Sequence, residues 1–131
     1  MRPAGLLHAE LLDVIAALGH GQTLVVADAG LPIPAETRRI DLAVRRGLPA
    51  FVDVLEVVLE AGVFEGGLIA SELLTTDPRL VEQIRARLAD VTLGTIPHDE
   101  LKGRAAEAVA VVRTGEFTPY ANIVLRAGVS F

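Results

Sequence analysis

The sequence predicts an α/β fold: a single three-layer α/β/α domain, residues 1–131, built on a mixed, largely parallel sheet. Short aliphatic runs without polar alternation, such as Thr23–Ala27, are typical of strands that are buried on both faces. Longer stretches with apolar residues at helical spacing separate these runs. A length of 131 residues is common for one domain, and the chain has no linker, internal repeat or low-complexity segment.

The first half of the chain predicts two helices and two strands. Apolar residues recur at helical spacing up to Gly19, where a helix would end, and again from Phe51 towards Gly62. Pro32 and Pro34 cannot continue a strand, because proline lacks a backbone donor and restricts its neighbour. The expected elements are, in order, a helix at 7–18, a strand at 23–27, a loop at 28–34, a strand at 39–44 and a helix at 50–60.

The second half predicts four strands and two helices. Asp77 followed by Pro78 is a typical helix start, with aspartate as the cap and proline at the first helical position. The remaining elements are predicted from apolar periodicity. They are a strand at 67–73, a helix at 78–89, a strand at 91–96, a helix at 98–106 and strands at 108–113 and 122–127.

Composition and charge restrict the partners of the protein. Seventeen acidic and twelve basic residues give a net charge of −5, which disfavours binding to phosphate backbones and to anionic lipid. We therefore expect no nucleic acid and no membrane as a partner, and no apolar run approaches the roughly 20 residues that span a bilayer. The N-terminus fits no secretory signal, and the lack of cysteine excludes disulfides and thiolate chemistry. A cytoplasmic location is the expectation.

The aliphatic composition suggests self-association. Hydrophobic residues make up 51% of the chain, with no tryptophan and one tyrosine, Tyr120. A domain of this size buries only about two thirds of its unfolded surface, so apolar side chains are left over for contacts between subunits. We expect a homo-oligomer.

Three histidines, His8, His20 and His98, are candidates for proton transfer, because imidazole titrates near neutral pH. His8 falls in the first turn of a predicted helix and is most simply a solvated helix residue. His20 lies between two glycines, which expose it to a ligand, although a plain helix-to-strand turn explains the same glycines. His98 follows Pro97 near a helix start, where a capping role is the simpler reading. No pair of histidines has the spacing of a metal site, so no metal is expected.

Asp28 lies at the carboxyl end of the first predicted strand, where ligands collect in α/β sheets. Its carboxylate would serve either to shape the turn before Gly30 or to orient an imidazole and fix its tautomer. The sequence leaves both readings open. The glycines form no phosphate-binding loop and no serine lies in a nucleophile elbow, so nucleotide binding and a serine triad are unsupported.

The richest polar segment is residues 113–122, RTGEFTPYAN, between two predicted strands. It is longer than a hairpin connection requires, which favours a role in recognition. Tyr120 and Asn122 supply directional hydrogen bonds to hydroxyl groups, which are the groups that a neutral sugar offers. A purely structural loop is the alternative.

With these segments in view, the chain resembles the D-ribose pyranase family from Leu6 to Phe131. The related L-fucose mutarotases share the Gly-His-Gly beginning but are less similar in the Gly-Leu-Pro loop and the Phe-Thr-Pro-Tyr-Ala-Asn string, so ribose is preferred over fucose. Residues 61–95 carry little of the family pattern. The strings that carry the resemblance are Leu18-Gly19-His20, Ala27 through Pro34, Ile40-Asp41-Leu42, Gly47 through Phe51, Arg113 through Asn122 and Ala127-Gly128-Val129.

The resemblance implies an α/β/α fold, no metal or organic cofactor, and a ring-shaped homo-oligomer, a decamer of two stacked pentamers. It also implies that His20 is the proton-transferring residue. The implied sugar-binding residues are Asp28, His98, Tyr120, Ala121 and Asn122.

These residues suit acid–base chemistry on a sugar ring. Opening β-D-ribopyranose to its aldehyde takes a proton from the anomeric hydroxyl and gives one to the ring oxygen, and reclosure through a different hydroxyl gives the furanose. Two alternatives remain: a mutarotase of another sugar such as L-fucose, and a non-catalytic sugar-binding module, in which a titrating His20 would be unnecessary.

Overall fold

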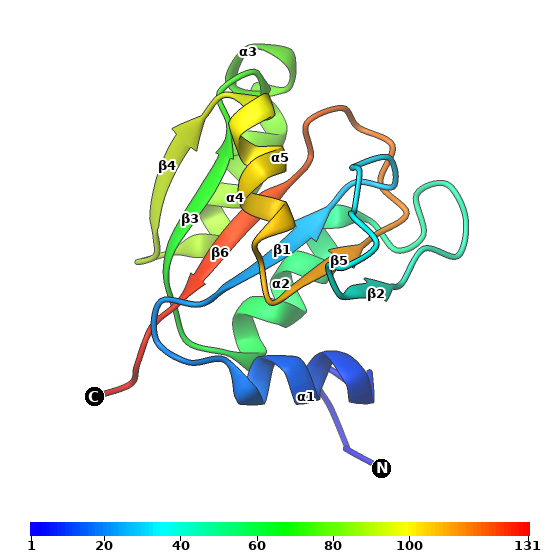
Figure 1. The fold of residues 1–131 in the computed structure, drawn as a ribbon, viewed down its shortest axis with the longest axis vertical. Coiled ribbons are helices and arrows are strands. Elements are labelled where there is room, and N and C mark those ends of the chain that lie inside the picture. The colour runs from blue at the N-terminus through cyan, green and yellow to red at the C-terminus, as the bar shows by residue number, and fades with distance from the viewer.

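The computed structural model describes residues 1–131 and arranges them as a six-stranded sheet between two layers of helices (Figure 1). The strands are β1 (Thr23–Ala27), β2 (Arg39–Asp41), β3 (Phe64–Ala70), β4 (Thr92–Ile96), β5 (Ala110–Arg113) and β6 (Ile123–Ala127). The helices are α1 (Ala9–Ala17), α2 (Phe51–Ala61), α3 (Leu73–Thr76), α4 (Pro78–Leu88) and α5 (His98–Ala106). The predicted α/β/α class is confirmed.

The sheet has the strand order β2-β5-β1-β6-β3-β4. Strand β5 is parallel to β2 and β1, and β3 is parallel to β4, whereas β6 is antiparallel to both of its neighbours. Five strands therefore run in one direction and β6 runs in the other. Their five carboxyl ends meet at one edge of the sheet, together with the start of β6, and this is the edge where ligands bind in α/β folds.

Both faces of the sheet are buried, in two separate cores. In β1, Leu24 and Val26 pack with helices α1, α2 and α4, while Val25 packs under α5. Figure 1 shows α5 lying across one face of the sheet, with the other long helices on the opposite side. Alternate side chains of a strand point to opposite faces, so a strand with two buried faces needs the unbroken aliphatic run that the sequence contains. None of the helices is both long and apolar enough to cross a membrane.

Two predicted strands have limits that are wrong by three residues, and three others begin one or two residues later than predicted. The strand expected at 39–44 ends at Asp41, because the Asp41 carboxylate accepts the N–H of Ala43 (3.0 Å) and forms a turn. The strand expected at 67–73 lies three residues earlier, and the short helix α3 that begins at Leu73 was not predicted. The N–H of Ser71 makes the last bond to β4 (2.8 Å), after which the chain turns.

The long connection between β5 and β6 has a topological cause. These two strands are not neighbours in the sheet, because β1 lies between them. Residues 114–122 therefore cross the carboxyl end of β1, where the Thr114 hydroxyl donates to Ala27 O (2.8 Å) and the Ala29 N–H donates to Glu116 O (2.8 Å). The segment that the sequence marked as rich in polar groups thus lies directly over Asp28.

Candidate functional site

Asp28 and Asn122 form two hydrogen bonds with each other where β1 ends and β6 begins. The Asp28 N–H donates to Asn122 Oδ1 (2.8 Å), and Asn122 Nδ2 donates to Asp28 Oδ2 (2.8 Å). Asp28 Oδ1 also accepts the N–H of Gly30 (2.8 Å), so the turn-forming reading of Asp28 is confirmed. Asn122 is fully buried. Its side chain therefore positions Asp28, and we do not expect it to meet a ligand directly.

Tyr120 lies beside this pair in a tight turn. Its φ of 65° is in the left-handed region, which costs a residue with a Cβ roughly 1–2 kcal/mol. The turn is closed by the Asn122 N–H, which donates to Tyr120 O (2.8 Å), and Ala121 between them is fully buried. The Tyr120 ring meets the ring of His98 edge to face, with centroids 5.0 Å apart. Backbone strain of this kind collects at functional sites.

His98 is the first residue of α5, and Glu72 fixes its position. The His98 N–H donates to both carboxylate oxygens of Glu72, at 3.0 and 3.2 Å. Hydrogen bonding from the backbone of Glu72 itself, and then from His98, holds the pKa of Glu72 below its ordinary value of 4.5, against a raising effect of burial. His98 Nδ1 is buried and has no hydrogen-bond partner within the chain.

A cavity of about 280 Å³ opens beside Asp28, between residues 28–30 and 116–119. Arg113 forms one wall, where its guanidinium donates to Ala29 O (3.0 Å) and to both oxygens of Asp41 (3.2 Å each). Burial alone would raise the pKa of Asp41, but the Ala43 N–H and Arg113 together lower it. The cavity has room for one small polar molecule.

Glu116 anchors the segment that covers this cavity. Its Oε1 accepts the N–H of Phe51 at the start of α2 (3.0 Å), where the helix dipole favours a negative charge. Its Oε2 accepts the Thr118 hydroxyl (2.9 Å). The preceding Gly115 packs so closely that an added Cβ would lie 2.5 Å from the carbonyl oxygens of Arg45 and Leu48. Specific hydrogen bonds and close packing therefore define the conformation of this segment.

His20 lies at the opposite end of the sheet from Asp28. It precedes β1, whereas Asp28 follows it, so five residues of strand, rising about 3.3 Å each and spanning roughly 16 Å, separate them. No imidazole contacts Asp28, and the reading in which Asp28 orients a histidine is wrong within one chain. The carboxylate beside His20 is that of Glu65, with both oxygens 3.2 Å from Nε2.

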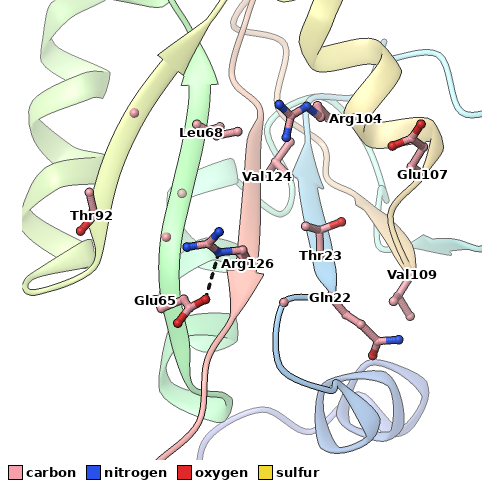
Figure 2. Close-up of a pocket in the computed structure, with 14 residues that line it drawn as sticks. Gln22, Thr23, Glu65, Leu68, Thr92, Arg104, Glu107, Val109, Val124 and Arg126 are labelled. Carbon is pink, nitrogen blue, oxygen red and sulfur yellow. Dashed lines mark ion pairs between the residues drawn. The ribbon is translucent and has the colours of Figure 1, made fainter.

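A second and larger cavity, about 630 Å³, lies on the α5 face of the sheet near this histidine. Figure 2 shows Glu65 on β3 and Arg126 on β6 pointing towards each other at its wall, with Arg126 Nε 3.0 Å from Glu65 Oε1. Gly66 and Gly94 help to leave the sheet surface open there, because a Cβ on either would point to the side of Arg126 or Leu68, which line the cavity. This hollow does not adjoin Asp28 or Tyr120, so the two cavities belong to two separate groups of polar side chains.

Comparison with known proteins identifies the family. Residues 1–130 match the model of the RbsD / FucU transport protein family. The chain belongs to this family. Among its members, the D-ribose pyranase of Variovorax paradoxus is 54% identical and that of Geobacillus thermodenitrificans 48% identical. The alignments cover all of this chain, with all of the first relative and 99% of the second.

Solved structures of the RbsD / FucU family have the same fold. RbsD of Bacillus subtilis complexed with D-ribose is 39% identical, with a TM-score of 0.95 over the whole of both chains. The fucose mutarotase of Streptococcus pneumoniae in complex with L-fucose is 23% identical, with a TM-score of 0.80 over 95% of this chain and 94% of that one. At that identity the second likeness concerns the fold alone.

The structure brings most of the predicted site residues of this family member together, and it adds contacts of three glutamates that the sequence did not predict. The structure brings together Asp28, His98, Tyr120, Ala121 and Asn122, and it places His20 elsewhere. His8 caps α1, where its Nδ1 accepts the Leu11 N–H (3.2 Å). No group of three or more His, Cys, Asp or Glu side chains gathers as a metal site. Three contacts had no signal in the sequence, namely those of Glu65, Glu72 and Glu116, because each reaches a partner at least 26 residues away.

Proposed function

We propose that the protein is a D-ribose pyranase, an isomerase that interconverts the pyranose and furanose forms of β-D-ribose without a cofactor. One observation carries the proposal: the hydrogen bonds to Asn122 and Gly30 hold the Asp28 carboxylate at the wall of a small cavity, at the same edge of the sheet as the contact between Tyr120 and His98. The support from relatives is the full-length identity of 42–54% to curated D-ribose pyranases.

The groups at the cavity suit a monosaccharide. Each oxygen of Asp28 accepts one hydrogen bond from the chain and keeps a further lone pair for a sugar hydroxyl. Next to the cavity, in the turn that the Asn122 N–H closes, Tyr120 adds a phenolic hydroxyl and a ring face. The cavity of about 280 Å³ lies near the lower end of the roughly 300–1,000 Å³ of ligand pockets, which favours one sugar ring over a nucleotide.

The reaction needs one group that moves protons. A base removes the proton of the anomeric hydroxyl while an acid protonates the ring oxygen, and the open aldehyde then closes through a different hydroxyl. An imidazole can serve in both steps, and such a group contributes roughly 10²–10⁴-fold to the rate. We propose His20 for this role, with Asp28, His98 and the segment Tyr120 to Asn122 binding or shaping the sugar site.

A site that contains both His20 and Asp28 requires two copies of the chain, because β1 separates the two residues. We therefore propose a homo-oligomer in which His20 of one copy reaches the sugar site of another; the ring-shaped decamer implied by the family resemblance is one such arrangement. Exposed apolar side chains near the sugar site support a contact there: Val44, Leu48 and Phe117 are 74%, 45% and 57% exposed. A single domain, residues 1–131, and a cytoplasmic location remain predictions from the sequence.

The function is tested by exchange NMR on purified protein. Saturation transfer between the ribose ring forms should be accelerated by the wild type and not by His20→Ala, with circular dichroism and light scattering as controls for folding and assembly. Parallel runs with L-fucose and galactose distinguish a mutarotase of another sugar. If the wild type binds ribose without accelerating exchange, the protein is a sugar-binding module and the proposal is rejected.

The shared site is tested by mixing two inactive variants. His20→Ala and Asp28→Ala should each lack activity. Co-assembly in equal amounts should restore about a quarter of the wild-type rate, because random mixing places an intact His20 against an intact Asp28 in that fraction of interfaces. Two inactive variants that stay inactive when they are co-assembled would contradict a site made by two copies.

A further inference from the structure

The His20 ring is held by one of its two nitrogens. His20 lies on the connection between α1 and β1, and its side chain is 58% exposed, so packing does little to fix its orientation. The following Gly21 has φ 86° and open space where a Cβ would lie. The contacts that hold the ring are those of Nε2, which is 3.2 Å from each carboxylate oxygen of Glu65.

Glu65 in turn is placed by the sheet. It lies near the start of β3, next to β6, and Arg126 on β6 reaches its Oε1 at 3.0 Å (Figure 2). Strand β6 is bonded on both sides, to β1 and to β3, so Arg126 lies on an interior strand, and Glu65 lies at the bulge of β3 between Phe64 and Gly66, next to the residue that pairs with Arg126. An exposed histidine is thus paired with a carboxylate that a neighbouring strand holds, and such support keeps a functional side chain in its geometry.

The chemistry of this contact assigns the two ring nitrogens. An ionised carboxylate only accepts hydrogen bonds, so Nε2 must carry a proton when it faces Glu65. A neutral imidazole carries a proton on only one of its two nitrogens. When Nε2 carries that proton, Nδ1 has the free lone pair and can accept a proton.

We propose that Glu65 is the positioning residue for His20, and that it leaves Nδ1 as the atom that exchanges protons with the sugar. The neutral ring accepts the anomeric proton at Nδ1, and the protonated ring returns a proton from Nδ1 to the ring oxygen, so the imidazole ends as it began. Arg126 orients the Glu65 carboxylate. This inference rests on the proposed function, in which His20 is the proton-transferring residue.

The first test uses the wild-type protein as it assembles. Long-range ¹H–¹⁵N correlation spectra of the His20 ring at a pH where it is neutral should show Nε2 protonated and Nδ1 bare. The opposite tautomer would overturn the assignment. This measurement needs no variant and no activity, so it holds even if a substitution at Glu65 impairs folding.

The second test uses Glu65→Gln, which keeps the size of the side chain but not its charge. Because the side chains of Glu65, His20 and Arg126 are 37%, 58% and 59% exposed, we expect folding and assembly to be little changed. The kcat for ribose exchange should fall roughly 10–100-fold, the range for losing a carboxylate that orients a functional imidazole, with KM changed less than about twofold. The Nε2-protonated form should also lose its predominance.

A matched control separates this role from a general effect of charge. Glu82→Gln removes a carboxylate from an exposed position on α4 and should leave kcat, KM and the His20 tautomer unchanged. If Glu65→Gln exchanges ribose at the wild-type rate, Glu65 is not a positioning residue, while the proposed function stands. A wild type that does not accelerate ribose exchange refutes the proposed function instead, and the tautomer alone then decides whether Glu65 holds the ring.

Discussion

Asn122→Ala removes the side chain that fixes Asp28, and we expect it to weaken both the fold and ribose binding. Asn122 is fully buried and exchanges two hydrogen bonds of 2.8 Å with Asp28. The Asp28 N–H would lose its acceptor, which costs roughly 1–3 kcal/mol. The Asp28 carboxylate would lose the hydrogen bond from Asn122 Nδ2, which costs about 1.5–3 kcal/mol more. Since the two effects share one side chain and part of the site stays hydrated, a loss of about 2–4 kcal/mol in the free energy of unfolding is expected.

The assay is urea unfolding at fixed protein concentration, together with calorimetric titration of ribose. Ribose affinity should fall by about 1–3 kcal/mol, because the Asp28 carboxylate is no longer held in place. A wild-type unfolding midpoint combined with unchanged ribose affinity would refute the argument that the pair organises the site.

Asn122→Asp is the matched variant. It keeps an acceptor for the Asp28 N–H but sets two carboxylates against each other at about the 2.8 Å of the present contact. Two carboxylates this close cannot both ionise, so one is expected to stay protonated, and the variant should regain stability as the pH falls and lose it as the pH rises. Asn122→Ala should lack this recovery in acid, which separates the loss of hydrogen bonds from the repulsion of charges.

Three further predictions concern the scaffold around the site. Gly115→Ala should destabilise the protein by about 1–3 kcal/mol, because its Cβ would lie 2.5 Å from two backbone carbonyl oxygens, whereas Gly103→Ala, in open space on α5, should be neutral or stabilising in the same melting experiment. Phe51→Ala should cost about 3–5 kcal/mol in urea unfolding, since the ring is fully buried, and a loss under 1 kcal/mol would contradict its place in the core. The pKa of Glu72 is lowered from 4.5, so its carboxylate is ionised and stabilises the His98 N–H above pH 4.5, and this contribution is lost as the pH falls through the lowered pKa. The chemical shift of the His98 amide should follow this titration, and Glu72→Gln should abolish the titration.

Local sequence signals predicted most of the elements. The strand Thr23–Ala27 and the helix His98–Ala106 have the predicted limits, and Asp77 caps α4 as expected, accepting the Leu80 N–H at 3.1 Å. The start of β3 was missed because Gly66 has little strand preference of its own. Pairing with β6 and β4 determines the limits of β3, and neither neighbour is adjacent to it in the sequence.

The sequence selected candidate residues but did not predict how the fold arranges them. Asp28 and Asn122 were both selected, yet their mutual hydrogen bonds span 94 residues and depend on β6 lying beside β1. The same strand explains why Glu65 was missed, since β6 also pairs with β3 and so brings Glu65 to the end of the sheet where His20 lies. A pattern within one segment carries no information about such contacts.

The direction of the strands places the two residues of the proposed mechanism, His20 and Asp28, at opposite edges of the sheet. In a sheet with five strands running one way, groups at the ends of these strands gather at one edge, as Asp28 and His98 do, and groups at their starts gather at the other, as His20 and Glu65 do. No small movement of a loop bridges the length of β1. The proposed function has His20 and Asp28 act on one substrate, and this requires a contact between two different surfaces of two copies. When the same contact is repeated from copy to copy, the copies form a closed ring if a whole number of them completes a full turn. Mixing His20→Ala with Asp28→Ala therefore tests the proposed chemistry and the proposed assembly in one experiment.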